Sequence, residues 1–185
     1  MNGQTVTSRS GRQLTVRRLS ERHAAALPAF HDQLSPRSRS LFTPHAYDAE
    51  TVAAYIERNS QGEDLIFVLE TGGDAIVGYF FLWEFTAPIP LLGIGLADDW
   101  QGEGLGKELM EILISEARAT GRDGIELTTH PDNERAFRLY RSVGFQETGL
   151  VENVAGDGRL LIERKMFLPL KDGAVPSTRE FKPPV

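Results

Sequence analysis

Three glycines stand at alternate positions, Gly102, Gly104 and Gly106, shortly after an apolar stretch that ends at Leu96. A helical pattern of apolar residues begins at Gly104. Glycine lets the backbone turn sharply and lets a ligand approach with no side chain in between. The free N–H groups of a first helical turn, together with the helix dipole, favour anions, and a phosphate or pyrophosphate is the natural guest. A turn that only packs the helix against the strand would carry similar glycines.

Two common phosphate-binding motifs do not fit this turn. A P-loop needs two glycines five positions apart followed by Lys and Ser or Thr, whereas Gln101 stands at the first glycine position and Glu108 follows Lys107. The dinucleotide fingerprint G-x-G-x-x-G fails because the third glycine comes one position early. Neither nucleotide-binding class is therefore expected.

A second pair of residues, Asn133 and Tyr140, is placed for chemistry further along the chain. Their separation corresponds to about 700° of helix rotation and about 10.5 Å of rise, so both side chains share one helix face. Asn133 also suits a helix N-cap, and Tyr140 also suits a core position ahead of the Gly144-Phe145 turn.

Taken together, the two segments resemble the GNAT superfamily of N-acetyltransferases. The first carries Gln101-x-x-Gly104-x-Gly106, and the second runs from His130 to Phe145 with Asn133, Ala136, Tyr140 and Gly144-Phe145 in the family's order. The resemblance extends over residues 12–168 and is strongest over 92–145. It implies an α/β fold with a mixed, mostly antiparallel central sheet flanked by helices, and an acetyl-CoA cleft where two strands splay apart.

The resemblance implies an N-acetyltransferase that moves an acetyl group from acetyl-CoA to a primary amine of a small-molecule or peptide acceptor by direct attack. A non-catalytic acetyl-CoA-binding module of the same fold is the alternative. The resemblance further implies that Tyr140 acts as general acid to the sulfur and that Asn133 holds the pantetheine arm or a water. It also implies that the Leu96 N–H polarises the thioester. The expected cofactor-binding residues are Ile94, Leu96, Gln101, Gly102, Glu103, Gly104, Leu105, Gly106, Lys107, Asn133 and Tyr140.

The general base is the least defined part of the expected site. Many family members carry a glutamate on the strand before the glycine loop, but here residues 90–96 contain no acid. Glu84, at the end of the preceding strand, is the nearest candidate, although an exposed strand-end carboxylate is the more common interpretation of such a position. His130 is a second titratable group beside the site, and an amine that arrives neutral needs no base.

The acceptor side is predicted from residues 35–45. This segment offers Arg37, Arg39 and Phe42. Guanidinium groups bind carboxylates through two hydrogen bonds, so an acceptor with a carboxylate near its amine is expected to bind there. A solvated basic loop is the alternative.

Periodicity supplies the elements that must position these residues. A flexible leader is expected at 1–10, one domain at 11–170, a loop at Ser35–Ser40, a turn at Thr71–Asp74 and an unstructured tail at 171–185. The expected strands are 14–19, 65–69, 75–85, 91–97, 125–129, 145–150 and 160–167, and the expected helices are 20–30, 48–58, 104–120 and 133–143.

Composition narrows the remaining classes. The chain has 185 residues and a formal net charge of −6, which suits one globular domain and argues against a surface that coats nucleic acid. With no cysteine, it has no disulfide or thiolate–metal site, and no metal is expected. No signal peptide or membrane-spanning stretch is evident, so a cytoplasmic protein that does not bind a membrane is expected. The resemblance also implies that a homodimer is one possible oligomeric state.

Overall fold

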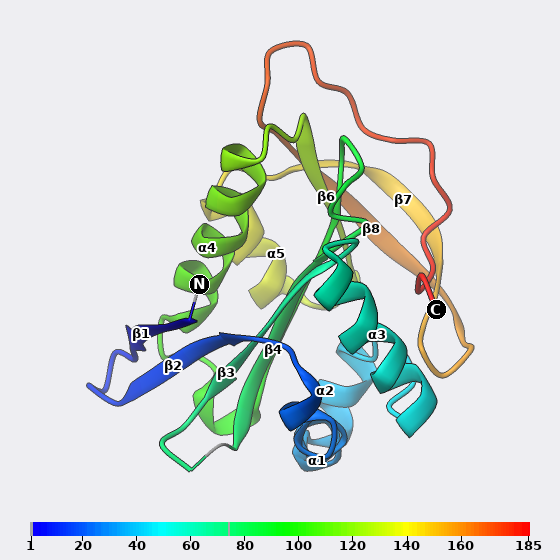
Figure 1. Ribbon diagram of the computed structural model, residues 1–185. Helices are drawn as coiled ribbons and strands as arrows, with labels where there is room; N and C mark the ends of the chain where they lie inside the picture. Colours follow the sequence, from blue (N-terminus) through cyan, green and yellow to red (C-terminus); the bar gives the residue numbers. More distant parts are fainter. Residues whose placement is uncertain (1, 74) are drawn as a thin grey trace.

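The computed structural model describes residues 2–73 and 75–185, and this part of the chain forms one mixed sheet between two layers of helices (Figure 1). The strand order is β1-β2-β3-β4-β5-β6-β8-β7. All neighbouring strands are antiparallel except β5 and β6. The strands are β1 (Asn2–Thr7), β2 (Gln13–Arg18), β3 (Leu65–Glu70), β4 (Ile76–Trp83), β5 (Leu91–Leu96), β6 (Gly124–Thr129), β7 (Gln146–Val154) and β8 (Leu160–Pro169).

Helices cover both faces of the sheet, with α4 and α5 on one side and α1, α2 and α3 on the other (Figure 1). Because both faces are covered, β3 and β4 are buried along their whole length. The helices are α1 (Ala26–Gln33), α2 (Pro36–Leu41), α3 (Ala49–Gln61), α4 (Leu105–Ala119) and α5 (Glu134–Ser142).

The parallel neighbours β5 and β6 separate almost at once. Their only pairing joins Leu91 to Glu126, whereas β5 pairs with β4 along its full length. This confirms the expected mixed, mostly antiparallel sheet with two splayed strands. The gap between β5 and β6 lies at the carboxyl ends of both strands, where ligands of open α/β sheets bind.

Three sequence expectations are corrected by the fold. The segment 1–10 was expected to be a flexible leader, but Asn2–Thr7 forms edge strand β1 against β2. Residues 35–40 were expected to form a loop, but Pro36–Leu41 is helix α2, because the Ser35 side chain accepts the Ser38 N–H and Pro36 suits a first turn. Asp74, in the predicted 71–74 turn, lies outside the described residues.

The expected tail, 171–185, is the third correction, because it packs back on the sheet. Phe181 is 3% exposed and pairs with Asn153 of β7. Ser177 donates through its N–H and its hydroxyl to the buried carboxylate of Glu126. These partners lie far back along the chain, so local composition could not predict them.

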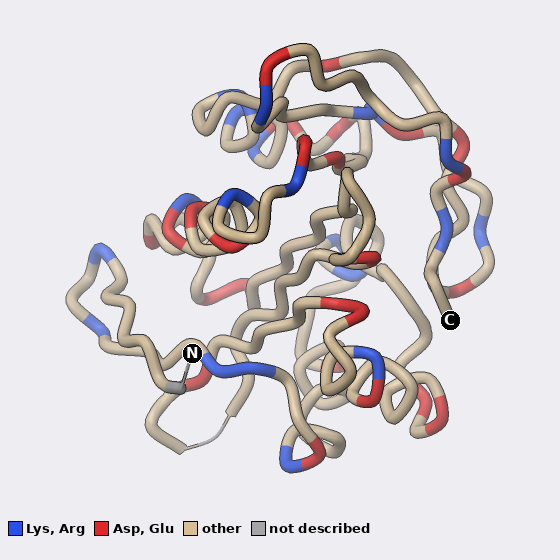
Figure 2. Tube along the Cα trace, turned by 45° about the horizontal axis from the view of Figure 1, so that its top comes forward, with Lys and Arg blue, Asp and Glu red and all other residues tan. Residues whose placement is uncertain are grey.

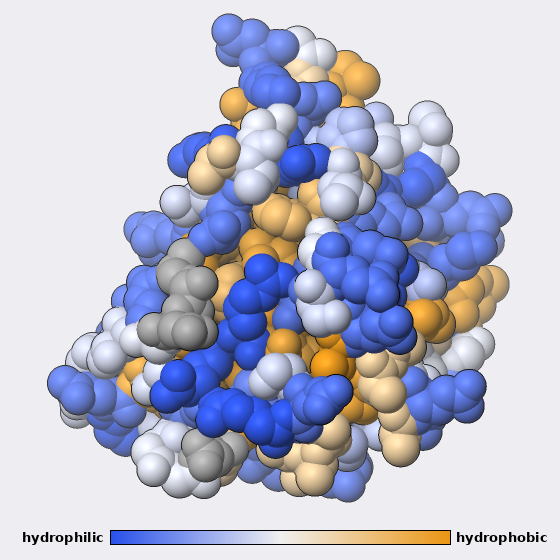
Figure 3. All heavy atoms as spheres, in the orientation of Figure 1, coloured by the Kyte–Doolittle hydropathy of each residue, from blue (hydrophilic) through white to orange (hydrophobic). Residues whose placement is uncertain are grey.

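Charged residues of both signs lie mostly on helices and loops, and most of the central strand positions are uncharged (Figure 2). The face in Figure 3 is accordingly mostly hydrophilic, with hydrophobic atoms showing in patches between the charged groups. Within residues 2–73 and 75–185, no helix has the length and apolar character needed to cross a membrane.

Candidate active site

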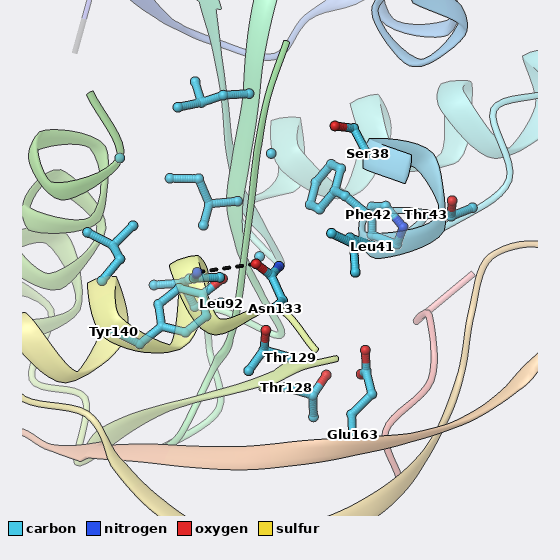
Figure 4. Close-up of a pocket in the computed structure, with 18 of the residues that line it drawn as sticks. Ser38, Leu41, Phe42, Thr43, Leu92, Thr128, Thr129, Asn133, Tyr140 and Glu163 are labelled. Carbon is cyan, nitrogen blue, oxygen red and sulfur yellow. Dashed lines mark hydrogen bonds between the residues drawn. The ribbon is translucent and has the colours of Figure 1, made fainter. Parts of the chain in front are cut away.

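A cleft of about 550 Å³ opens at the splay between β5 and β6. This volume lies in the range of small-molecule sites. Figure 4 shows two facing walls, with Ser38, Leu41, Phe42 and Thr43 on one side and Thr128, Thr129, Asn133, Tyr140 and Glu163 on the other. The glycine loop, β5, α5, the α2 segment and the β7–β8 hairpin therefore meet at one site.

The glycine loop reaches the cleft in the conformation that its glycines permit. Gly102 and Gly104 both have φ of +83°, the left-handed region that side chains disfavour. Gly106 has a different role, since a Cβ there would lie 2.9 Å from Leu139 Cδ2. Its missing side chain thus lets α4 approach α5 closely.

Gln101 connects three walls of the cleft. Its Nε2 donates to the Leu96 carbonyl at 3.0 Å and to Ser38 Oγ at 3.3 Å. Its Oε1 accepts from Arg135 Nη1 at 3.2 Å. Gln101 therefore fixes the loop against β5 and α2, a positioning role that the sequence motif alone does not reveal.

Cationic side chains surround the glycine-loop end of the cleft. Lys107, expected from the sequence, lines it, together with Arg9 and Arg135, which sequence reasoning missed. Two other expected residues do not line it. Leu105 is buried in the core, and the Glu103 carboxylate accepts from the Ser10 N–H on the β1–β2 turn. Only backbone groups of these two residues remain available for a phosphate.

One edge of β5 is unpaired along the gap. The Ala97 N–H donates to the carbonyl of Val77 in the neighbouring strand β4. Along an antiparallel pair, successive residues direct their N–H and carbonyl groups alternately toward and away from the neighbouring strand. Ile94 and Leu96 must then direct their N–H groups away from β4, and the β5–β6 pairing ends before them. Both expected residues thus offer backbone donors to the cleft.

The glycines inside β5 let aromatic rings lie directly on the strand. A Cβ at Gly93 would lie 2.1 Å from Phe81 Cζ, and one at Gly95 would lie 2.4 Å from Phe42 Cδ1. No bulge interrupts the β4–β5 ladder. These two glycines therefore allow the close approach of the rings and do not mark a bulge.

Tyr140 and Asn133 lie on the cleft face of α5, as their spacing predicts. Tyr140 is 6% exposed, and burial, with a smaller contribution from the Glu163 charge, raises the pKa of its hydroxyl. Its proton is therefore held at neutral pH. Asn133 is also the α5 N-cap, accepting the Ala136 N–H at 3.2 Å (Figure 4, dashed line).

Glu84, the expected base, lies outside the cleft lining. Its side chain is 51% exposed and forms an ion pair with Arg179 at 2.5 Å. The residue follows the end of β4 at a turn with φ of +50°. Its place at the end of a strand suggested that Glu84 would lie close to the acceptor amine. In the structure its carboxylate pairs instead with Arg179 of the packed C-terminal segment.

A different carboxylate, Glu163 of β8, lines the cleft and was missed by sequence reasoning. It is 7% exposed, and Asn153 Nδ2 donates to its Oε2 at 2.6 Å. Glu163 follows the apolar run Leu160-Leu161-Ile162 but precedes Arg164 and Lys165, so no local pattern in the sequence marked it as a buried residue.

The three expected acceptor residues separate in the structure. Phe42 lines the main cleft, and Arg37 lines a smaller adjoining cavity with His130 and Arg159. Arg39 lines neither, although its carbonyl accepts from Thr43. Of the two arginines that were expected to bind the acceptor, only Arg37 therefore lines a cavity beside the cleft.

Comparison with known proteins places this architecture and cleft in one family. Residues 13–146 match the acetyltransferase (GNAT) domain. The chain belongs to the GNAT acetyltransferase family.

Relatives of this chain include the N-alpha-acetyltransferase RimI of Mycobacterium tuberculosis, 42% identical over 88 residues. That match covers 45% of this chain and 54% of the relative. The [ribosomal protein bS18]-alanine N-acetyltransferase of Salmonella typhimurium is 30% identical over 51% of this chain and 64% of the relative. The chain thus spans between half and two thirds of the length of these relatives.

Solved structures share the fold at lower identity. The acetyltransferase yncA from Salmonella typhimurium, solved with its cofactor acetyl-CoA, has a TM-score of 0.68 at 23% identity, covering 90% of this chain and 99% of that one. The ribosomal-protein-S5-alanine acetyltransferase from Vibrio fischeri has a TM-score of 0.73 at 15% identity, covering 88% and 96%.

Proposed function

We propose that this protein is an acetyl-CoA-dependent N-acetyltransferase that acetylates a primary amine by direct attack. One observation carries the proposal: the glycine loop, the unpaired edge of β5 and the buried Tyr140 hydroxyl belong to the same cleft. These are the parts needed to hold a pyrophosphate, place a thioester and protonate a leaving thiolate.

The phosphate end of acetyl-CoA would lie at the glycine loop. Its backbone N–H groups and the start of α4 favour negative charge, and Lys107, Arg9 and Arg135 add cationic side chains. The pantetheine arm would then run along β5 from Leu96 toward Ile94, pairing with the free backbone edge as an added strand does.

The thioester would lie beyond Leu96, toward Ile94. Leu96 stands at the glycine-loop end of β5, and Gln101 already occupies its carbonyl. Ile94 lies deeper in the gap, nearer the Leu91 pairing. We therefore assign its N–H to the thioester oxygen, in place of the Leu96 N–H that the resemblance implies, and leave the Leu96 N–H to the pantetheine arm. A donor fixed in the backbone needs no reorganisation as negative charge develops there.

Tyr140 would supply the proton for the departing thiolate. The neutral amine nitrogen bonds to the thioester carbon, the carbon–sulfur bond breaks, and the sulfur takes the phenolic proton. The nitrogen then loses one proton, which restores the phenol through solvent. A hydroxyl that keeps its proton at neutral pH suits this role.

The acceptor proposed for the first test is a peptide α-amine. Two relatives and one solved neighbour carry names that state alanine or N-alpha acetylation. A small polyamine is the second acceptor to test, because another solved neighbour is a spermidine N-acetyltransferase from Vibrio cholerae in complex with CoA and spermine.

A non-catalytic acetyl-CoA-binding module is the competing function, favoured by the absence of an acid on β5. The test is to incubate the protein with acetyl-CoA and an alanine-initiated peptide, spermidine or a free amino acid, and to follow thiol release. Thiol release that requires an amine supports the enzyme. Tight acetyl-CoA binding without thiol release across the set would support the module.

A further inference from the structure

Glu163 is the acidic side chain that faces the cleft from β8. It extends from the sheet beside Thr128 and Thr129, on the same wall as Asn133 and Tyr140 (Figure 4). The sheet and the β7–β8 hairpin leave it 7% exposed, so its charge is largely removed from solvent.

The carboxylate of Glu163 forms no ion pair with any residue that the structure describes. Its hydrogen-bond partner is the neutral amide of Asn153 at 2.6 Å. Burying a carboxylate without a cation is costly. Another buried carboxylate on the same sheet, Glu126, does have a cation, because Lys165 Nζ lies 3.0 Å from its Oε1.

The cations near the β7–β8 hairpin, at the Glu163 end of the cleft, have other partners. Arg159 pairs with Asp157 at 2.7 Å, and Lys182 lies 3.4 Å from Glu180. Arg164, next to Glu163 in sequence, pairs with Glu134 at 3.0 Å. A cation for Glu163 is therefore left to come from a ligand.

The position of Glu163 is fixed by its neighbour rather than left free. Asn153 donates from the same Nδ2 to Thr128 Oγ1 at 3.1 Å. Its backbone is held in turn by the bridge to Phe181. This arrangement keeps one carboxylate oxygen hydrogen-bonded, while the side chain still lines the cleft.

We propose that Glu163 binds the ammonium group of the acceptor and takes its proton before attack. The inference rests on the proposed acetyl transfer and assigns the base that β5 lacks. An α-ammonium group has a pKa of about 8 and a lysine-type ammonium about 10, so either reaches the cleft mainly protonated. One N–H proton passes to the carboxylate, and the freed nitrogen bonds to the thioester carbon. The carbon–sulfur bond then breaks and CoA departs with the phenolic proton of Tyr140. The nitrogen loses a second N–H proton, which restores the phenol through solvent, and the proton on Glu163 leaves to solvent.

The test compares wild type with Glu163→Gln on two kinds of nucleophile. The first is an amine that is protonated in solution, the alanine-initiated peptide or spermidine. The second is hydroxylamine, which is neutral at mildly alkaline pH and needs no base. Acetyl-CoA affinity is measured in parallel by calorimetry, and transfer is measured above the enzyme-free rate.

We expect Glu163→Gln to lower kcat/KM for the protonated amine by about 10²- to 10⁴-fold, the usual range for a general base. Transfer to hydroxylamine and acetyl-CoA affinity should stay close to wild type. Glu152→Gln is the matched control, because it makes the same change on an exposed residue of the same hairpin, and it should alter neither reaction.

Two results would overturn the assignment. An equal loss with both nucleophiles would make Glu163 a structural residue, and no loss with either would leave it without a role in the reaction. Failure of the proposed function itself would be visible in wild type, as bound acetyl-CoA with no transfer to any nucleophile, and the assignment of Glu163 would be rejected with it.

Discussion

The ring of Phe42 lies in the space that a side chain at Gly95 would take, with Cδ1 2.4 Å from the position of a Cβ. This contact joins the wall at the end of α2, which we propose for the acceptor, to the strand that would carry the pantetheine arm. The shape of the cleft therefore depends on an absent methyl group.

Gly95→Ala should displace Phe42 and lower the free energy of unfolding by about 1–3 kcal/mol, as overpacked positions do. The acceptor KM should rise, since the displaced ring lines the cleft. Urea unfolding and steady-state kinetics measure the two effects. Gly72→Ala is the control, because its Cβ would meet nothing within 4 Å. Equal stability of the two variants would contradict the contact.

Gly104→Glu should abolish the rise in melting temperature that acetyl-CoA produces by binding the native state. The added carboxylate would stand where the loop is expected to hold phosphates. Gly104→Ala separates this effect from backbone strain at φ of +83°, and it should lower stability while keeping much of the ligand-induced shift. A folded Glu variant with an undiminished shift would place the cofactor elsewhere.

Tyr140→Phe keeps the buried ring and removes the hydroxyl. If Tyr140 protonates the thiolate, kcat should fall by about 10²-fold or more while acetyl-CoA affinity changes little. Thiol release and calorimetry measure the two quantities. Wild-type turnover in this variant would leave Tyr140 as a packing residue against Phe145.

Arg37→Ala and Arg39→Ala should differ, because only Arg37 lines the cavity beside the cleft. With an acceptor that bears a carboxylate, Arg37→Ala should raise the acceptor KM and leave the acetyl-CoA KM unchanged, the signature of lost uniform binding. Arg39→Ala should leave both constants near wild type. A larger effect at Arg39 would reverse the placement of the two side chains.

His45 should make stability depend on pH. The ring is fully buried, its Nδ1 bonds the Ala46 carbonyl, and its Nε2 lies 3.0 Å from the Tyr79 hydroxyl. Burial lowers the pKa of His45 from 6.5 to about 4. Between these values the unfolded chain binds the extra proton, so stability is present above pH 6.5 and is lost as the pH falls toward 4.

The expected loss from His45 over this window is about 3 kcal/mol, at about 1.4 kcal/mol per pKa unit. Urea unfolding of wild type and His45→Gln across the same pH series isolates it from other titrations. The difference in unfolding free energy between the two proteins should shrink as the pH falls. A constant difference would show that His45 does not contribute this pH dependence.

Local spacing was enough to predict the geometry of the half of the cleft that we propose for the cofactor. Gln101, Gly104 and Gly106 follow a strand and open a helix, and Asn133 and Tyr140 share one helix face, because a helix of fixed pitch sets their relation. Hydrophobic periodicity also predicted most of the strands, including the buried pair β3 and β4. These features depend on neighbours only a few residues away.

Only the tertiary structure decided the half of the cleft that we propose for the acceptor. Glu84 and Glu163 are both carboxylates on strands, yet Glu84 meets Arg179, 95 residues further along the chain, while Glu163 meets Asn153 and faces the cleft. Strand alternation gives the face of a side chain but not which distant segment covers it. The edge strand β1 and the packed segment 171–185 escaped prediction for the same reason. Their positions depend on partners that the folded chain brings together and that no local pattern records.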